Sequence, residues 1–350
     1  MPTRSVTIAA VLISIYLLIQ FLWYSQSILI PLIFAVLIWN ILRTMANTLQ
    51  KTPIVGSWIP SAMAILASFS VVIFVFILIG RIVSENLQSM MASSGDLQNN
   101  LSILLNKIPL MGMDKAYVLS LLQNSLKQIN FQRLLVGFYS AMTNFMSSLF
   151  LIMLFVLFFF LEQVCFDEKI SRLFVGKIPR DKASFLLQKI PSEIQRYLGL
   201  KSLFSALTAF CIYILMKAMG VEFAEFWGVC IFLLNFIPNI GALVMTLIIT
   251  LFAYFQWLDI SKVMLFFGLQ VLCHAFIGNF LETHYLGRKM HLSPLFLLLA
   301  LGFWGSLWGG MGLFLAVPMT VLMMIILSSF ESTRFWAILM SENGELPNEV

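Results

Sequence analysis

Apolar runs of the length that crosses a membrane dominate this sequence. The first three cover residues 6–24, 28–42 and 60–80, and a spanning helix needs about 20 mostly apolar residues. Only 11% of the 350 residues are charged and 60% are apolar, whereas a soluble domain carries about 25% charged residues. So few charges cannot cover a surface that faces water, which excludes soluble globular, disordered, coiled-coil and collagen-like chains. We predict an all-α polytopic membrane protein with about eight transmembrane helices.

Two polar stretches interrupt the apolar runs. Residues 81–135 place apolar residues at helical spacing among polar ones, which predicts an amphipathic helical region outside the hydrocarbon. Residues 162–201 hold eight of the 21 Lys and Arg residues, and short loops rich in these residues stay in the cytoplasm. Counting spans from this loop places both termini in the cytoplasm and residues 81–135 outside.

The chain therefore divides into five predicted parts. In order, they are three transmembrane helices in residues 1–80, the extracytoplasmic region 81–135, a fourth helix with the basic cytoplasmic loop in 136–201, a C-terminal transmembrane bundle with broken helices in 202–335, and a cytoplasmic tail in 336–350. Within them, the fourth and fifth spans are expected at about 138–161 and 202–219.

Beyond residue 220 the apolar segments become short and are interrupted by Gly and Pro. Residues 225–250 and 302–327 each contain Phe-Trp-Gly, then a break, then a long apolar tail. Paired broken helices are typical of transporter binding sites, because a break frees backbone groups that are tolerated only inside protein or beside a wet cavity. The alternative is a pair of kinks that serve only helix packing. Whether residues 223–257 and 293–330 span the membrane or re-enter it stays open.

Polar residues recur at four-residue steps in the apolar segment of residues 263–281 and at its end. They are Gln270, His274, Gly278 and Glu282, with Asn279 beside them. This spacing keeps them within about a third of the helix circumference, and ionisable residues at membrane depth usually face the bundle interior or a water path. Glu282 could bind a coupling proton or cation, or it could be an interfacial carboxylate paired with Arg288 or Lys289. His274 could carry a proton or be a satisfied core histidine.

The breaks supply further candidate residues. Asn235 and Asn239 could cap freed backbone groups or hydrogen-bond a polar solute, while Gly305 and Gly309 form a small-xxx-small pair typical of close helix packing. The predicted solute or ion path comprises Asn235, Pro238, Asn239, Gly241, Gln270, His274, Asn279, Glu282 and Arg288. The predicted breaks and packing positions are Gly287, Ser293, Pro294, Gly305, Gly309, Gly310, Gly312 and Pro318.

Motifs of soluble enzymes are absent from the sequence. It contains no G-x-G-x-x-G, P-loop, H-E-x-x-H or G-x-S-x-G, so we predict no enzymatic activity. Glu282, His284 and His291 are close enough in sequence to hold a metal ion, but ordinary polar residues of a surface loop explain them better. We therefore predict no metal and no cofactor. No basic stretch with interleaved aromatic residues indicates nucleic-acid binding, and the four cysteines form no Cys-x-x-Cys pair.

The motifs together resemble the autoinducer-2 exporter (AI-2E) family of bacterial membrane proteins. The resemblance rests on "FWGVCIFLLNFIPNIG" at 226–241, "GNFLETHYLGRKMHLSPL" at 278–295 and "GFWGSLWGGMGLFLAVPMTV" at 302–321. It implies an inner-membrane carrier with about eight spans that forms a homo-oligomer. Members are linked to export of autoinducer-2 or to sodium(lithium)/proton antiport. By motif, the resemblance carries over to Asn235, Pro238, Asn239, Gly241, Asn279, Glu282, Gly287, Arg288, Ser293, Pro294, Gly312 and Pro318.

Two positions depart from the family pattern. The family usually has Glu-Pro where this chain has Glu282-Thr283, and Gly-Pro-x-Gly-Met where this chain has Gly309-Gly310-Met311-Gly312. We expect both departures to affect the identity of the substrate more than the fold.

Three functions from different classes fit the sequence. A transporter of a small polar solute such as autoinducer-2 would recognise it through hydrogen-bonding side chains, for which Asn235, Asn239, Gln270 and Asn279 are suitable. A sodium(lithium)/proton antiporter would instead need a carboxylate, and Glu282 is the best candidate. A non-transporting scaffold would use the polar segments to recruit partners, but it would not require broken helices.

Overall fold

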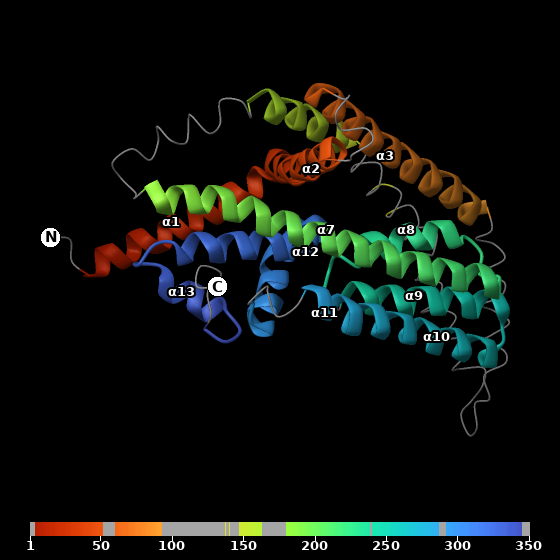
Figure 1. Cartoon of the computed structure of the whole chain (residues 1–350). Helices are drawn as coiled ribbons and strands as arrows, with labels where there is room; N and C mark the ends of the chain where they lie inside the picture. The colour runs from red at the N-terminus through yellow and green to blue at the C-terminus, as the bar shows by residue number, and fades with distance from the viewer. Residues whose placement is uncertain are drawn as a thin grey trace, which may run out of the picture. The chain divides into compact units, whose positions relative to one another are not determined.

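The computed structural model describes residues 4–51, 60–92, 137, 140, 147–162, 180–238, 240–286 and 292–344. Within these residues every regular element is a helix, apart from an isolated bridge between Leu292 and Ser341 (Figure 1). The predicted all-α class is therefore confirmed.

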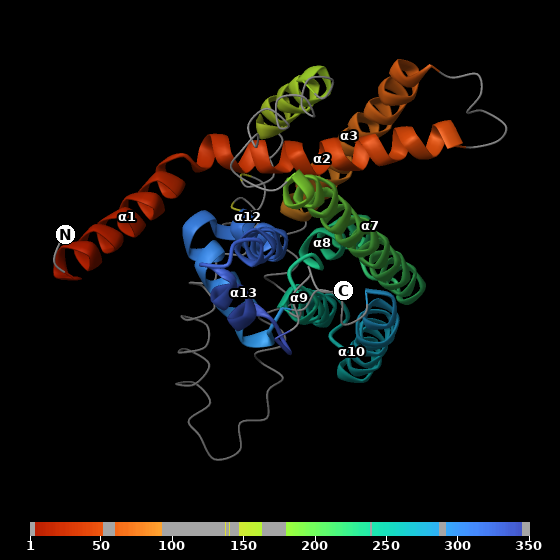
Figure 2. The same cartoon turned by 60° about the vertical axis from the view of Figure 1, so that its left-hand side comes forward.

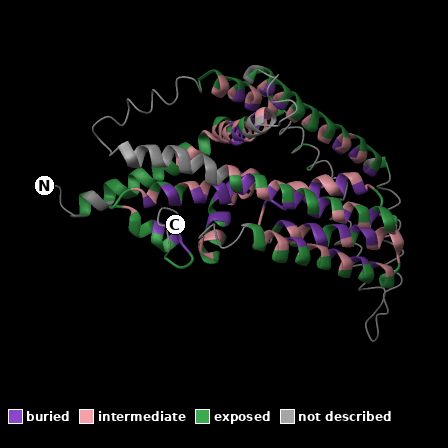
Figure 3. Cartoon of the chain, in the orientation of Figure 1, coloured by how far each residue is buried: buried purple, intermediate pink, exposed green. Residues whose placement is uncertain are grey.

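Six described helices are long and apolar enough to cross a membrane. They cover Gln26–Arg43, Met63–Met90, Gln195–Met219, Ile240–Trp257, Ile260–Glu282 and Pro294–Ser328. Three shorter apolar helices cover Ala9–Tyr24, Ser147–Glu162 and Ala224–Leu234. Many large apolar side chains point outward from these helices, as the exposed residues of α1 (Arg4–Tyr24) illustrate in Figure 3. Such a surface suits a lipid bilayer, and the protein is a polytopic membrane protein.

The chain forms two compact units. Unit 1 comprises Met1–Ser68, Ser148–Gly199 and Leu286–Val350, and unit 2 comprises Phe69–Ser147 and Leu200–Tyr285. Two long helices, α3 (Ser61–Ala92) and α7 (Arg180–Met219), each contribute residues to both units.

In unit 1, α1 and α2 (Gln26–Lys51) are joined by a one-residue turn at Ser25. The carbonyls of a last helical turn lack donors within the helix, and one of them, Leu22, accepts a hydrogen bond from the indole Nε1 of Trp308 at 3.1 Å. Trp308 belongs to α12 (Pro294–Ser328), so this bond ties α1 to α12.

The second sequence break bends α12 in its middle. Gly309 has φ 62° and ψ −141°, a combination that essentially only glycine adopts. A Cβ on Gly312 would overlap the carbonyl oxygen of Trp304, although residues eight apart in a straight helix lie far from each other. The helix therefore changes direction sharply, as Figure 1 shows. The short helix α13 (Arg334–Met340) packs against α12, and the Met340 carbonyl accepts from the Ser293 N–H at 2.9 Å.

Unit 2 contains a bundle of helices that lie side by side in Figures 1 and 2. They are the C-terminal half of α7, α8 (Ala224–Leu234), α9 (Ile240–Trp257), α10 (Ile260–His274), the π-helix η1 (Ala275–Glu282) and α11 (Thr283–Leu286). Aliphatic residues of α3 and α7 and aromatic residues of the other helices form the core: Val83, Leu87, Met90, Ile212, Met216, Phe226, Trp227, Phe252 and Phe266. Asp259 caps α10 by accepting hydrogen bonds from the N–H groups of Ser261 and Lys262.

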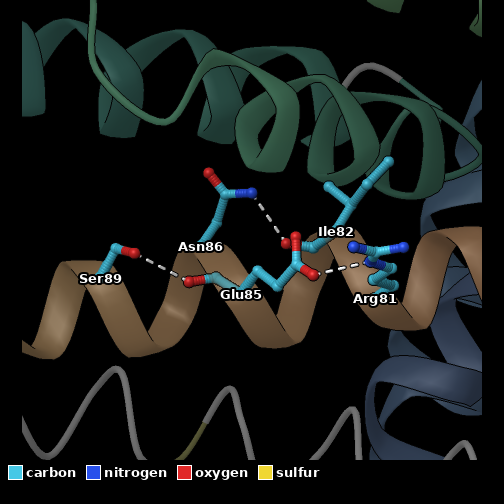
Figure 4. Close-up of polar contacts among 5 residues, drawn as sticks. All are labelled: Arg81, Ile82, Glu85, Asn86 and Ser89. Atoms are coloured by element: carbon cyan, nitrogen blue, oxygen red, sulfur yellow. Dashed lines mark hydrogen bonds and ion pairs between the residues drawn. The ribbon is translucent and has the colours of Figure 1, made fainter.

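The apolar run at residues 60–80 does not end its helix. α3 continues to Ala92, and its last turns are amphipathic. Val83, Leu87 and Met90 enter the core of unit 2. Polar residues occupy other faces of the same turns, where Arg81 pairs with Glu85 at 2.7 Å (Figure 4). Asn86 and Ser89 hydrogen-bond the carbonyls of Ile82 and Glu85, one turn earlier.

The first sequence break forms the tip of a helical hairpin made by α8 and α9. Its open end is closed by Gln256, whose Oε1 accepts from the Glu222 N–H at 3.0 Å and whose Nε2 donates to the Gly220 carbonyl at 2.8 Å. At the tip, a Cβ on Gly241 would overlap the carbonyl oxygen of Leu234, so only glycine permits this close turn. α8 has 11 residues, roughly 16 Å of helix, against a hydrocarbon core of about 30 Å. α8 is therefore too short to cross the core by itself, whereas α9, with 18 residues, is one of the candidate spans.

Candidate functional site

A buried ion pair joins α7 to η1 in unit 2. The Nζ of Lys201 lies 2.6 Å from Oε1 of Glu282, and the two side chains are only 7% and 17% exposed. Lysine and glutamate are almost never buried unless they are paired. Lys201 lies within the candidate span Gln195–Met219, and Glu282 ends the candidate span Ile260–Glu282. The two charges neutralise each other where the beginning of the first span meets the end of the second.

The hairpin tip contacts α7 one turn away from this ion pair. Asn235, the C-terminal cap residue of α8, is buried and its Nδ2 donates to the Oγ of Ser205 at 3.3 Å. Ser205 follows Lys201 by four residues, so both lie on one face of α7. We call Lys201, Ser205, Asn235 and Glu282 the polar cluster. It brings together side chains from three separate segments of unit 2.

The π-helical geometry of η1 sets the direction of Glu282. A π-helix closes i→i+5 hydrogen bonds and therefore winds more residues into each turn than an α-helix does. Side chains at four-residue steps, which drift in one sense along an α-helix, drift back in a π-helix. Gln270 is buried, and His274, Gly278 and Glu282 are half-buried, whereas Phe276 and Phe280 are exposed. The predicted polar stripe therefore stays on the protein side, and π segments are frequent at functional sites.

A second polar contact joins α10 to α9. The Nε2 of Gln270 donates to the Oγ1 of Thr250 at 3.1 Å, and Gln270 is completely buried. Its Oε1 and the Nε2 of His274 are also buried, and neither has a hydrogen-bond partner among the residues that the structure describes. His274 lies one turn after Gln270, directly before η1 begins.

The other predicted path residues stand apart from the polar cluster. Pro238 is half-buried in the hairpin turn, and Gly241 is buried behind it. Asn279 is exposed on η1. Asn239 and Arg288, together with the predicted break residue Gly287, lie outside the described residues. The pairing of Glu282 with Arg288 or Lys289, considered from the sequence, lies outside the described residues, and among the described residues Glu282 pairs with Lys201.

The remaining break and packing residues belong to unit 1. Ser293 precedes α12 without a side-chain cap, and Pro294 occupies its first turn, where its missing N–H costs little. A Cβ on Gly305 would come within 2.7 Å of Leu313 Cδ2, while Gly310 is exposed and has open space. Pro318 is buried inside the second half of α12.

Lys201 was missed by the sequence analysis. It was counted among the eight basic residues of the 162–201 loop, with the fifth span starting at residue 202. In the structure α7 begins at Arg180, and its candidate span begins at Gln195. The available signal was spacing, because Lys201 continues the helical pattern of Ser205 and Thr208.

No group of three His, Cys, Asp or Glu side chains that could hold a metal ion occurs among the described residues.

Comparisons with known proteins identify the family of the chain. The family described as AI-2E family transporter matches residues 10–332. The AI-2 transport protein TqsA of Escherichia coli K12 is 26% identical over 324 residues, which are 91% of each chain. Putative transport proteins of Borreliella burgdorferi and Haemophilus influenzae are 30% and 31% identical, each over 60% of this chain. These two alignments span 58% and 59% of the relatives' own length, less than two thirds.

Proposed function

Because the chain belongs to the AI-2E family of transporters, we propose that it is a secondary transporter that exports a small polar solute. The relative TqsA is named an AI-2 transport protein, so autoinducer-2 is the first candidate solute. The observation that carries the proposal is the polar cluster, buried among apolar helices beside the tip of a hairpin. Polar groups in such a place are costly and usually serve a solute or ion path.

The chemistry of the polar cluster suits an uncharged solute. Autoinducer-2 is small and rich in hydroxyl groups, so its recognition requires hydrogen-bond donors and acceptors rather than charge. Lys201 and Glu282 neutralise each other at 2.6 Å, so the pair offers polar atoms without a net charge. The Asn235 amide, one turn away, has both donor and acceptor atoms. The sequence contains no P-loop, so we expect transport to draw on an ion gradient or on the gradient of the solute itself.

Sodium(lithium)/proton antiport is the second candidate, and the burial of Glu282 favours it. A half-buried carboxylate in a membrane helix is a typical binding group for a proton or monovalent cation. Here the ammonium group of Lys201 already occupies that carboxylate, so a cation or proton would have to compete with it. A non-transporting scaffold is the third candidate, and it would give no flux of either kind.

We further propose that the protein lies in the bacterial inner membrane with both termini in the cytoplasm and works as a homo-oligomer. The basic segment 162–201 supports this orientation through the positive-inside rule.

The test is flux of autoinducer-2 from proteoliposomes that contain the purified protein, with and without an imposed pH gradient. We expect saturable flux that empty liposomes lack. Glu282→Gln should abolish gradient-driven flux if the carboxylate couples protons, and should leave downhill flux of autoinducer-2 intact if it does not. Glu222→Gln is the matched control, because Glu222 is an exposed glutamate of unit 2. Absence of autoinducer-2 flux, together with sodium- or lithium-driven proton movement that Glu282→Gln removes, would establish antiport instead.

A further inference from the structure

Gln270 and His274 leave two buried polar atoms without partners. The Gln270 amide is anchored through its Nε2 to Thr250 Oγ1 at 3.1 Å. Its Oε1 and the Nε2 of His274 have no hydrogen-bond partner among the described residues. The amide can be turned over without changing its shape, but one of its two ends then still lacks a partner. Most buried polar side chains have a hydrogen-bond partner, so these two unpaired atoms on one helix, which we call the orphan atoms, require an explanation.

Gln270 and His274 lie on one face of α10, at a structural transition. Residues four apart on a helix have Cβ atoms about 6 Å apart on one face, so the two side chains leave α10 side by side. Thr250 of α9 contacts this face through its bond to Gln270. The π-helix η1 starts at Ala275, directly after His274. Twelve residues beyond Gln270, the same helical segment reaches Glu282 in the polar cluster.

The chemistry of the orphan atoms matches a hydroxyl group. An amide oxygen only accepts hydrogen bonds, whereas the Nε2 of a neutral imidazole can carry a proton and donate. A single hydroxyl group does both, since its hydrogen donates and its oxygen accepts. Residues 271–281 contain no Asp, Glu, Lys or Arg, so this stretch of the path carries no formal charge that would attract an ionic solute.

We propose that Gln270 and His274 form a hydroxyl-binding subsite for an uncharged, hydroxylated solute. The Gln270 Oε1 would accept from the hydroxyl group, and the His274 Nε2 would donate to it. This inference rests on the proposed transport function and narrows the substrate to a neutral molecule with at least one free hydroxyl group.

Chemical modification of the histidines tests the subsite without any transport assay. The full-length protein in lipid nanodiscs is treated with diethyl pyrocarbonate, and the modification rates of His274 and His284 are measured by peptide mass spectrometry. Glycerol is the probe, and 1,2,3-trimethoxypropane is its matched analogue, because the ether keeps the oxygen acceptors but has no O–H donor. We expect glycerol to slow modification of His274 saturably and the ether to leave it unchanged. His284 is exposed and reports any general effect of glycerol on the reagent.

Two variants separate binding from a structural role. Gln270→Leu keeps the side-chain volume and removes the acceptor. It should raise the glycerol concentration that gives half-maximal protection about tenfold, which corresponds to the loss of one hydrogen bond. Thr208→Val is the control, because the Thr208 hydroxyl is buried and bonds only its own helix at the Phe204 carbonyl. If the orphan atoms are merely structural, Gln270→Leu will leave the protection of His274 by glycerol unchanged.

The outcomes distinguish this inference from the proposed function. Lack of protection by glycerol in the wild type overturns the subsite, as does a His274 that stays inert while His284 reacts. A bound water that hydrogen-bonds Gln270 Oε1 and His274 Nε2 would also leave His274 unprotected by glycerol. If glycerol protects His274 although autoinducer-2 flux is absent, the subsite stands and autoinducer-2 is not the substrate. If autoinducer-2 flux is present and Gln270→Leu does not change it, and if glycerol does not protect His274, the subsite is wrong and the transport function stands.

Discussion

At the scale of single residues, the ion pair between Lys201 and Glu282 makes a prediction about stability. Removing one partner leaves the other charge buried and unpaired, which costs roughly 3–5 kcal/mol. We therefore expect Lys201→Met to lower the free energy of unfolding strongly. The double variant with Glu282→Gln should lose much less than the sum of the two single variants, because neither group is then charged. A double-mutant cycle on denaturant unfolding in detergent measures this coupling.

The matched control is the exposed pair of Arg81 and Glu85 on α3. Its distance of 2.7 Å is almost the same as in the buried pair, but its side chains are 76% and 62% exposed. Exposed pairs contribute about 0.2–1 kcal/mol, so the cycle with Arg81→Met and Glu85→Gln should show little coupling. Equal coupling in the two cycles would contradict the burial of the Lys201–Glu282 pair.

Sequence reasoning identified one member of this pair and missed the other. Glu282 stood out because it continues the four-residue steps of Gln270, His274 and Gly278. Lys201 did not, since it closes a run of basic residues and its helical environment depends on where α7 starts. Composition cannot place a helix boundary within a few residues. The sequence left open whether Glu282 pairs with Arg288 or Lys289 or serves a path, and its contact with Lys201 lies 81 residues away in sequence, which only tertiary packing reveals.

At the scale of elements, the bend of α12 depends on two glycines for different reasons. Gly309 has φ 62°, so Gly309→Ala should cost about 1–3 kcal/mol of backbone strain. A Cβ on Gly312 would overlap the Trp304 carbonyl oxygen, so Gly312→Ala requires the backbone to move and should cost more. Gly310→Ala is the control because it meets no described atom within 4 Å. Melting temperatures should fall in the order Gly310→Ala, Gly309→Ala, Gly312→Ala, and equal values for all three would contradict the bend.

The existence of both breaks was predictable from the sequence, but their geometry was not. Gly and Pro clusters between apolar segments mark the places where helices stop. The tight approach of Gly241 to the Leu234 carbonyl depends on how α8 and α9 pack. The π-helix of η1 was also hidden, because i→i+5 hydrogen bonds leave no clear trace in residue types. Gln270, His274, Gly278 and Glu282 nevertheless stay at least partly buried, since the drift in α10 and the opposite drift in η1 offset each other.

At the scale of the whole molecule, composition predicts an all-α membrane protein but does not predict how its segments group into compact units. Few charges and many apolar runs require a membrane protein, and the structure has six helices of spanning length among its described residues. The division into two compact units, with α3 and α7 shared between them, does not follow the five predicted segments. A linear sequence orders segments by chain position, whereas packing joins segments such as residues 69–92 and 200–285 that are far apart in the chain.

The hairpin geometry leads to a prediction about which residues face the same side of the membrane. Gln256 bonds Gly220 and Glu222, so both ends of the α8–α9 hairpin lie where α10 begins. The candidate span Ile260–Glu282 has 23 residues, more than the roughly 20 that a spanning helix needs. Single cysteines at Glu222 and Ser261 should therefore react with a membrane-impermeant maleimide from one side, and one at His284 from the other. All three positions are exposed.

The labelling uses a variant in which the four native cysteines are replaced. With the basic segment 162–201 in the cytoplasm, Glu222→Cys and Ser261→Cys should be labelled in intact spheroplasts, and His284→Cys only after permeabilisation. Labelling of Glu222→Cys and Ser261→Cys from opposite sides would mean that residues 223–257 cross the membrane once, which contradicts the hairpin. Labelling of Ser261→Cys and His284→Cys from the same side would mean that α10 and η1 do not span, and the polar cluster would then lie outside any transmembrane path.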